Sequence, residues 1–165
     1  MSTTEKTRVE MTQMVLPAFA NALGNAFGGQ VMAWIDIAAA VAAQRHCRAQ
    51  VVTASIDAVH FIAPIKQGYV VVLRAQVNAT FNTSMECGVS VIAEDPLTGE
   101  THQAVRAYAT FVSLDAEGRP QKVPPLTAET PEDQRRAQDA VERRAQRLAL
   151  RQEVARKVAE REAAS

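Results

Sequence analysis

The sequence predicts an α+β fold in which one curved antiparallel sheet wraps around a central apolar helix, with a charged helix after it at the C-terminus. Three observations carry this prediction. The 34 residues between Glu10 and Arg45 contain a single charged side chain, Asp36, which indicates a segment buried inside the domain. Residues 51–115 are rich in Val, Thr, Ile, Phe and Tyr, which favour strands. From residue 129 the composition changes to Arg, Ala and Glu.

The composition limits the class of protein. The 165 residues suffice for one domain and a tail, and the formal net charge of zero provides no basic excess for binding DNA or RNA. Cys47 and Cys87 are too few for a disulfide framework, and residues 1–10 hold no apolar signal-peptide core. Pro, Gly and Asn interrupt the uncharged stretch before it reaches the length of a membrane span. We therefore expect a cytoplasmic protein with no nucleic-acid or membrane partner.

The first half of the chain predicts a strand, a loop and a buried helix. In residues 8–16, every second side chain shares one face, and Pro17 ends the run, as expected of a strand. The glycines and asparagines of residues 19–30 indicate an irregular loop. The Ala-rich run from Phe27 to Cys47 is apolar on every side, which is typical of a core helix.

Four long strands are expected next, at residues 51–62, 68–81, 84–95 and 101–115. Their connectors are short, which favours antiparallel neighbours because parallel strands need crossovers of a dozen residues or more. A single antiparallel sheet curved around one buried helix is the hotdog arrangement. Such a sheet covers only one side of its helix, so we expect oligomerisation to bury the remainder.

The C-terminal segment predicts a locally basic helix. Residues 135–157 carry eight Arg or Lys against three acidic residues, whereas residues 1–128 carry nine basic and ten acidic residues. We place the boundary between a hotdog domain at residues 1–126 and a helical extension at residues 127–165. We expect a thin apolar stripe to hold the extension on the body, and the core to fold when the chain ends at Ala128. The stripe consists of Ala137, Val141, Leu148, Val154 and Val158.

Asp36 is the main chemical candidate, because a lone carboxylate in an apolar helix is costly unless it has a partner or meets a water-filled cleft. It either satisfies a partner subunit's backbone, caps a neighbouring element or acts as a general base. Gly28 and Gly29 precede the helix, whose first N–H groups suit a developing oxyanion, although tight packing explains them equally well. Asn21 and Asn25 also suit a turn.

Several other kinds of site are disfavoured. There is no G-x-S-x-G nucleophile motif and no phosphate-binding glycine motif. His46, His60 and His102 are scattered without the spacing of metal ligands. Cys47 is adjacent to His46, and neighbours in sequence point to different sides of a helix, which disfavours a catalytic pair.

The run from Asn21 to Ala40, N-x-x-G-N-x-F-G-G-Q-V-M-x-W-I-D-I-A-A-A, closely resembles the hotdog-fold acyl-CoA thioesterases. These include bacterial single-domain acyl-CoA hydrolases and animal cytosolic hydrolases with tandem hotdog domains. The match extends over about residues 8–126. Further segments that share the family's pattern are RHC (45–47), VVTASIDAVHF (51–61), FNTSME (81–86) and YATFVSLD (108–115). The resemblance implies hydrolysis of acyl-CoA to free CoA and a carboxylic acid, with no metal or organic cofactor.

The resemblance also implies roles for individual residues. Asp36 activates the attacking water, direct attack through an anhydride being the rival role. Asn21 orients water or thioester, and the N–H groups around Gly28 and Gly29 polarise the carbonyl. The implied CoA contacts are Thr53, Ala54, Ser55, Asn82, Thr83, Ser84 and, for the nucleotide phosphates, Arg144. Ordinary strand and turn composition explains Thr53, Ser55 and Thr83 as well, and a solvated helix face explains Arg144.

Two other functions are weighed against hydrolysis. Acyl-thioester hydration needs a His close to the carboxylate, and none occurs within nine residues after Asp36. A non-catalytic acyl-CoA binder would not need both Asn21 and Asp36. The acyl-chain preference is open, because the packing of residues such as Phe19, Phe27, Trp34 and Phe61 would set the depth of the pocket.

Helix geometry predicts a site shared between two chains. Asp36 lies eight residues beyond Gly28, which corresponds to roughly 12 Å along one helix at about 1.5 Å per residue. Groups that act on one carbonyl must meet within about 3 to 3.5 Å. We therefore expect Asn21 and the glycines from one protomer and Asp36 from its partner. Relatives suggest a homodimer that assembles further into a homohexamer, a trimer of dimers.

Overall fold

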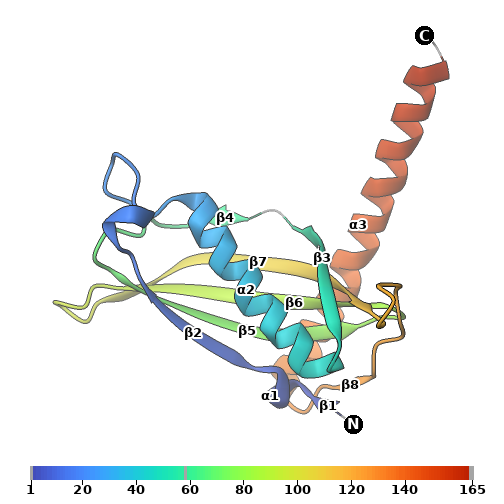
Figure 1. Cartoon of the computed structure of the whole chain (residues 1–165), viewed down its shortest axis with the longest axis horizontal. Helices are drawn as coiled ribbons and strands as arrows, with labels where there is room; N and C mark the ends of the chain where they lie inside the picture. The colour runs from blue at the N-terminus through green and yellow to red at the C-terminus, as the bar shows by residue number, and fades with distance from the viewer. Residues whose placement is uncertain (1, 58, 164–165) are drawn as a thin grey trace.

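A six-stranded antiparallel sheet carries a 20-residue helix on one face in the computed structural model, which describes residues 2–57 and 59–163 (Figure 1). The strand order is β2-β5-β6-β7-β3, and β4 pairs with β7 on the same side as β3. This arrangement confirms the hotdog fold expected from the sequence. The strands are β2 (Val9–Met14), β3 (Gln50–Ile56), β4 (His60–Phe61), β5 (Val70–Thr80), β6 (Ser84–Glu94) and β7 (Thr101–Leu114).

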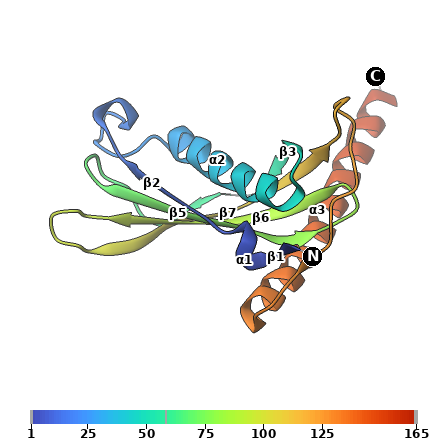
Figure 2. The same cartoon turned by 60° about the horizontal axis from the view of Figure 1, so that its bottom comes forward.

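Alternation along the strands explains how the sheet separates two environments. On β6, Met85, Cys87 and Val89 belong to the hydrophobic core beneath the helix, and the residues between them face the other side. Register shifts in three strand pairs, one of them between Thr53 and Ser55, interrupt the regular ladders. Such bulges increase the local twist of a strand. Figure 2 shows the curled sheet with the helix on its concave side.

The central helix, α2 (Gly28–Cys47), buries only one face in the single chain. The buried residues recur at helical spacing from Val31 to His46, and Ile35, Ala38 and Ala42 are fully inaccessible. The opposite face exposes Met32 and Ile37. One face of α2 is therefore open in the single chain, as expected for a sheet that covers only one side of its helix.

The segment predicted as one strand at 51–62 is divided. β3 ends at Ile56, and β4 pairs separately with β7 through His60 and Phe61. Short elements without a sequence pattern complete the chain: β1 (Ser2–Thr3), α1 (Thr4–Thr7), the 3-10 turn η1 (Pro17–Phe19) and β8 (Leu126–Thr127). β1 pairs with β8 in parallel, so the expected domain boundary at residue 126 falls inside a small sheet that ties the N-terminus to the later segment.

The charged helix α3 (Pro131–Ala163) crosses one end of the sheet and then projects away from it (Figures 1 and 2). Its first half contacts β5, and Ala140 is fully buried, whereas all residues from 148 to 163 are exposed. The predicted apolar stripe is largely wrong as a docking surface, because Val141, Leu148, Val154 and Val158 are all exposed and only Ala137 is half-buried. Within the residues that the structure describes, no helix is long and apolar enough to cross a membrane.

Candidate active site

The start of α2 presents free backbone donors. Phe27 occupies the N-cap position and provides no side-chain cap, and the first bond within the helix runs from Val31 N to Phe27 O at 3.1 Å. The N–H groups of Gly28, Gly29 and Gln30 therefore have no acceptor among residues 2–57 and 59–163. Together with the positive end of the helix dipole, they can hold an oxygen that gains negative charge.

The two glycines differ in what surrounds them. A Cβ on Gly28 would lie 3.3 Å from the ring of Phe61, a tight contact that a glycine avoids without any shift of this ring. A Cβ on Gly29 would meet nothing within 4 Å. Close packing thus accounts for Gly28, while the space at Gly29 is open for an approaching group.

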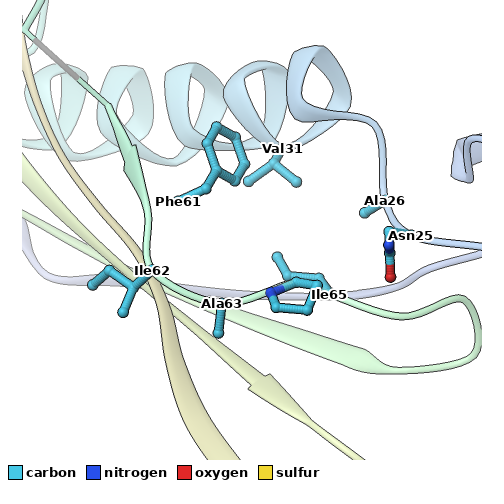
Figure 3. A pocket seen from close by; sticks show the side chains of 8 residues that line it. Asn25, Ala26, Val31, Phe61, Ile62, Ala63 and Ile65 are labelled. Atoms are coloured by element: carbon cyan, nitrogen blue, oxygen red, sulfur yellow. The ribbon is translucent and has the colours of Figure 1, made fainter. Parts of the chain in front are cut away.

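A pocket of about 290 Å³ adjoins this first helical turn (Figure 3). Its lining is apolar except for Asn25, and Phe61 and Val31 point toward each other across it. The other lining residues are Ala26, Ile62, Ala63, Pro64 and Ile65. Of the four residues expected to set its depth, only Phe61 lines this pocket; Trp34 is buried with its ring edge-on to Phe19, and Phe27 is exposed.

Asn21 organises the loop beside the pocket. Its side-chain oxygen accepts bonds from the N–H groups of Leu23 at 3.0 Å and Asn25 at 3.2 Å, and Gly24 adopts a positive φ of 73° in the turn. The turn-forming interpretation of Asn21 is therefore confirmed. Its side-chain nitrogen donates to no group in the described part of the chain, so it is free to bind water or substrate.

Asp36 lies two turns further along α2, on the partly exposed face. Its Oδ1 accepts a hydrogen bond of 2.7 Å from the hydroxyl of Thr53 on β3. The resemblance implied that Thr53 binds CoA, yet the structure pairs it with the carboxylate. Nothing in the sequence signals this pair, because it depends on how β3 lies against the helix.

The other implied CoA contacts gather at one end of the sheet. In the register, Thr53 pairs with Phe111, Ser55 with Thr110 and Ser84 with Val112, so β7 separates the two groups by two strand spacings, about 10 Å. Thr53 and Ser55 stand opposite consecutive residues of β7 and thus face opposite sides of the sheet. Ala54 lies at the bulge between them.

Backbone hydrogen bonds fix the turn that follows β5, at residues 81–84. Phe81 N bonds to Ser84 O at 2.8 Å, and the carbonyls of Asn82 and Thr83 accept bonds from Val123 N and Ser113 N. Arg144 of α3 places its guanidinium 4.2 Å from the centre of the Phe81 ring. The structure therefore places Arg144 against Phe81, the residue that precedes residues 82–84 in the chain. It leaves the start of α2 and Asp36 of the same chain apart.

Other reactive groups stay outside this arrangement. Burial raises the pKa of the Cys87 thiol far above its usual range, which keeps it protonated. Among the described residues, no group of three or more His, Cys, Asp or Glu side chains is placed to hold a metal ion.

Comparison with known proteins gives a consistent set of relatives. Residues 23–100 match the model of the thioesterase superfamily. The chain is 41% identical to an uncharacterized acyl-CoA thioester hydrolase of Bacillus subtilis, over 78% of this chain and 75% of that protein. It is 43% identical to mouse acyl-coenzyme A thioesterase 11, over 87% of this chain but only 24% of the mouse protein.

Solved structures agree in fold. An acyl-CoA hydrolase from Staphylococcus aureus, in complex with butyryl-CoA, CoA and CoA disulfide, is 34% identical with a TM-score of 0.88, covering 95% of this chain and 96% of that one. The same hydrolase has been solved with single alanine replacements of an aspartate, an asparagine and a threonine. An apo-hexameric acyl-CoA thioesterase is 37% identical with a TM-score of 0.86, and the match covers 90% of this chain and 97% of that one.

Proposed function

Because the chain belongs to the thioesterase superfamily, we propose that it hydrolyses the thioester of acyl-CoA to free CoA and a carboxylic acid. The observation that carries this proposal is the Asp36 carboxylate, held by Thr53 on the open face of α2. In the Staphylococcus aureus hydrolase, the replaced asparagine, aspartate and threonine follow one another at the same intervals as Asn21, Asp36 and Thr53. That correspondence supports a common role for the three positions.

In the proposed reaction, the thioester oxygen accepts hydrogen bonds from the N–H groups of Gly28 and Gly29 at the start of α2. Asp36 takes a proton from water as the water oxygen bonds to the carbonyl carbon. The helix start stabilises the resulting oxyanion. When the carbonyl re-forms, the C–S bond breaks and the proton on Asp36 passes to the departing sulfur, which gives CoA and the acid.

Thr53 and Asn21 orient the reacting groups in this mechanism. The Thr53 hydroxyl occupies Oδ1 of Asp36, which directs the second carboxylate oxygen toward water. The free side-chain nitrogen of Asn21 donates to the water or the thioester, while its oxygen keeps the loop in shape. The acyl chain enters the apolar pocket beside α2.

The proposed site draws on two protomers. Asp36 and the start of its own α2 are roughly 12 Å apart at about 1.5 Å per residue, too far for one carbonyl. The exposed Met32 and Ile37 on α2 and the uncovered β3 edge provide an apolar surface for a second copy around a two-fold axis. The hexameric relative supports further assembly of the dimers into a trimer of dimers.

Binding of CoA is proposed at Ala54, Ser55 and residues 82–84, with Arg144 at the phosphates, whereas Thr53 is proposed to orient Asp36. Ser, Thr and Asn suit the amides of the pantetheine arm, and the Arg144 guanidinium suits phosphate oxygens. No metal or organic cofactor takes part in the proposed reaction.

The test is thiol release by the purified protein from a series of acyl-CoAs, acetyl to palmitoyl, and from one unsaturated acyl-CoA, followed with a free-thiol reagent. Hydrolysis releases one thiol per acid formed, and the series also reports the chain-length preference. Hydration would consume an unsaturated substrate without releasing thiol. A binding protein would retain CoA esters without turnover, and either of these results would overturn the proposal.

A further inference from the structure

Glu86 of β6 is completely buried on the side of the sheet that faces α3. Arg143 reaches it with Nη2 at 2.7 Å from Oε1 and with Nε at 3.2 and 3.3 Å from the two oxygens, and Arg147 adds Nη1 at 2.9 Å from Oε2. Burial lowers the pKa of Arg143, but the hydrogen bonds and charge of Glu86 outweigh it and raise the pKa overall. Both oxygens of the buried Glu86 carboxylate therefore accept hydrogen bonds from positively charged guanidinium groups.

The same cluster extends across three neighbouring strands. Arg147 Nη1 also lies 2.6 Å from Oδ2 of Asp57, the residue that follows β3. The guanidinium of Arg143 stacks on the Tyr108 ring of β7, 3.7 Å from its centre. The backbone carbonyl of Tyr108 in turn accepts a hydrogen bond of 2.9 Å from the backbone N–H of Asp57. We call Asp57, Glu86, Arg143 and Arg147 the α3 anchor. It joins β3, β7 and β6 to one turn of α3.

The α3 anchor determines where Arg144 lies. Arg143 and Arg147 are one turn apart and share a single carboxylate, so the helix can neither slide nor rotate without breaking several charge-assisted bonds. Arg144 is consequently held over Phe81, beside residues 82–84. Within the described residues, its guanidinium donates to no protein acceptor, which leaves its N–H groups available to an anion.

A role in stability alone does not require this cluster. Well-packed apolar side chains in place of a buried ion pair are often as stabilising or more so, since charges lose their hydration on burial. What the ion pairs add is directional geometry, because two guanidinium groups and one carboxylate define a single register of the helix on the sheet.

We propose that the α3 anchor positions Arg144 for the nucleotide end of the substrate, with Arg147 and Asp57 acting as positioning residues. The proposal rests on the proposed function, since it takes acyl-CoA as the ligand. Arg147 and Asp57 do not touch the substrate in this account. They act by holding α3 against the strand and turn that carry the CoA contacts.

The test compares Arg147→Gln, Arg147→Lys and Asp57→Asn with butyryl-CoA and with butyryl-pantetheine, which lacks the nucleotide. For Arg147→Gln and Asp57→Asn, we expect KM for butyryl-CoA and Kd for free CoA to rise about 5- to 50-fold, a usual range for coupling between separate groups. The kcat should stay within about twofold and KM for butyryl-pantetheine should not change, because these substitutions leave Asp36 in place. Arg147→Lys keeps the charge and should recover part of the affinity.

The matched control is Arg156→Gln, which removes an exposed arginine of the same helix whose partner is Glu160 of α3 itself. An equal rise in KM for both thioesters, a loss of kcat, or no change at all would overturn the proposal. Should Arg147→Gln not fold, Asp57→Asn provides the same comparison. Absence of thiol release by the wild-type protein refutes the proposed function instead, and the Kd of free CoA then still tests the α3 anchor.

Discussion

At the scale of single residues, the proposed chemistry depends on the hydrogen bond between Thr53 and Asp36. The hydroxyl engages one carboxylate oxygen at 2.7 Å and leaves the other for water. For Asp36→Asn, which keeps the side-chain size and removes the base, we predict that kcat falls by about 10² to 10⁴. Steady-state thiol release measures this effect, and size-exclusion chromatography checks that the oligomer is intact. Near-normal turnover would assign Asp36 a structural role.

Thr53→Val separates the two interpretations of Thr53, because it removes the hydroxyl at nearly constant shape. If the hydroxyl orients Asp36, kcat should fall about 10-fold, which corresponds to about 1.4 kcal/mol, while KM for acyl-CoA stays the same. A raised KM at unchanged kcat would mean that Thr53 binds CoA instead. Gln50→Ala, an exposed position at the beginning of the same strand, is the control for general disturbance of β3.

Departure from the local pattern singled out Asp36 in an apolar helix and the two glycines at its start, whereas Asn21 fits a turn and was proposed only from the family resemblance. It did not reveal that Thr53 pairs with Asp36, or that Phe61 packs on Gly28. Both contacts join residues of different elements, 17 and 33 positions apart in the chain, and their existence depends on the angle between α2 and the sheet. Turn chemistry did predict the hydrogen bonds of Asn21.

At the scale of elements, the hydropathy pattern of α3 does not identify the face by which this helix docks on the sheet. The thin apolar stripe predicted the wrong face, since Ala140 and polar residues make the contact. Helical periodicity locates apolar faces, and a helix that docks through charges leaves no such signal. The presence of α3 and its excess of basic residues were nevertheless predictable from composition.

The two halves of α3 should differ on truncation. Ending the chain at Ala149 removes residues 150–165, of which those described, 150–163, are all exposed, so the melting temperature and KM should stay unchanged. Ending it at Ala128 should still leave a folded core, but a loss of about 3 kcal/mol would lower the melting temperature by roughly 6 to 12 °C. Thermal unfolding followed by circular dichroism measures both. Complete unfolding of the shorter chain at 25 °C would refute the domain boundary.

Asp133 gives the beginning of α3 a dependence on pH. Burial works to raise the pKa of Asp133, but hydrogen bonds from Thr130 and Gln76 and the charge of Arg8 hold it below its usual value of 3.8. A carboxyl with a lowered pKa stabilises the fold above its unfolded value, and this contribution disappears as pH falls through the folded value. Asp133→Asn should therefore destabilise the protein at pH 7 and less so at pH 3. A urea midpoint difference that is equal at both pH values would contradict this.

At the scale of the whole molecule, the order of elements was predictable because short connectors leave few topologies for four long strands. The pairing of β1 with β8 was not, since two-residue strands carry no periodic signal. Cytoplasmic location and hexameric assembly stay predictions. The exposed face of α2 is the structural reason to expect at least a dimer.

The central claim is that one active site takes Asn21 from one protomer and Asp36 from its partner, and mixing inactive subunits tests it most directly. Asn21→Ala and Asp36→Ala chains are unfolded, combined in equal amounts and refolded together, with each variant refolded alone as the control. In a mixed dimer one site carries both substitutions and the other neither, so random pairing should restore about a quarter of wild-type turnover. No recovery in dimers verified to contain both variants would mean that Asn21 and Asp36 act within one chain.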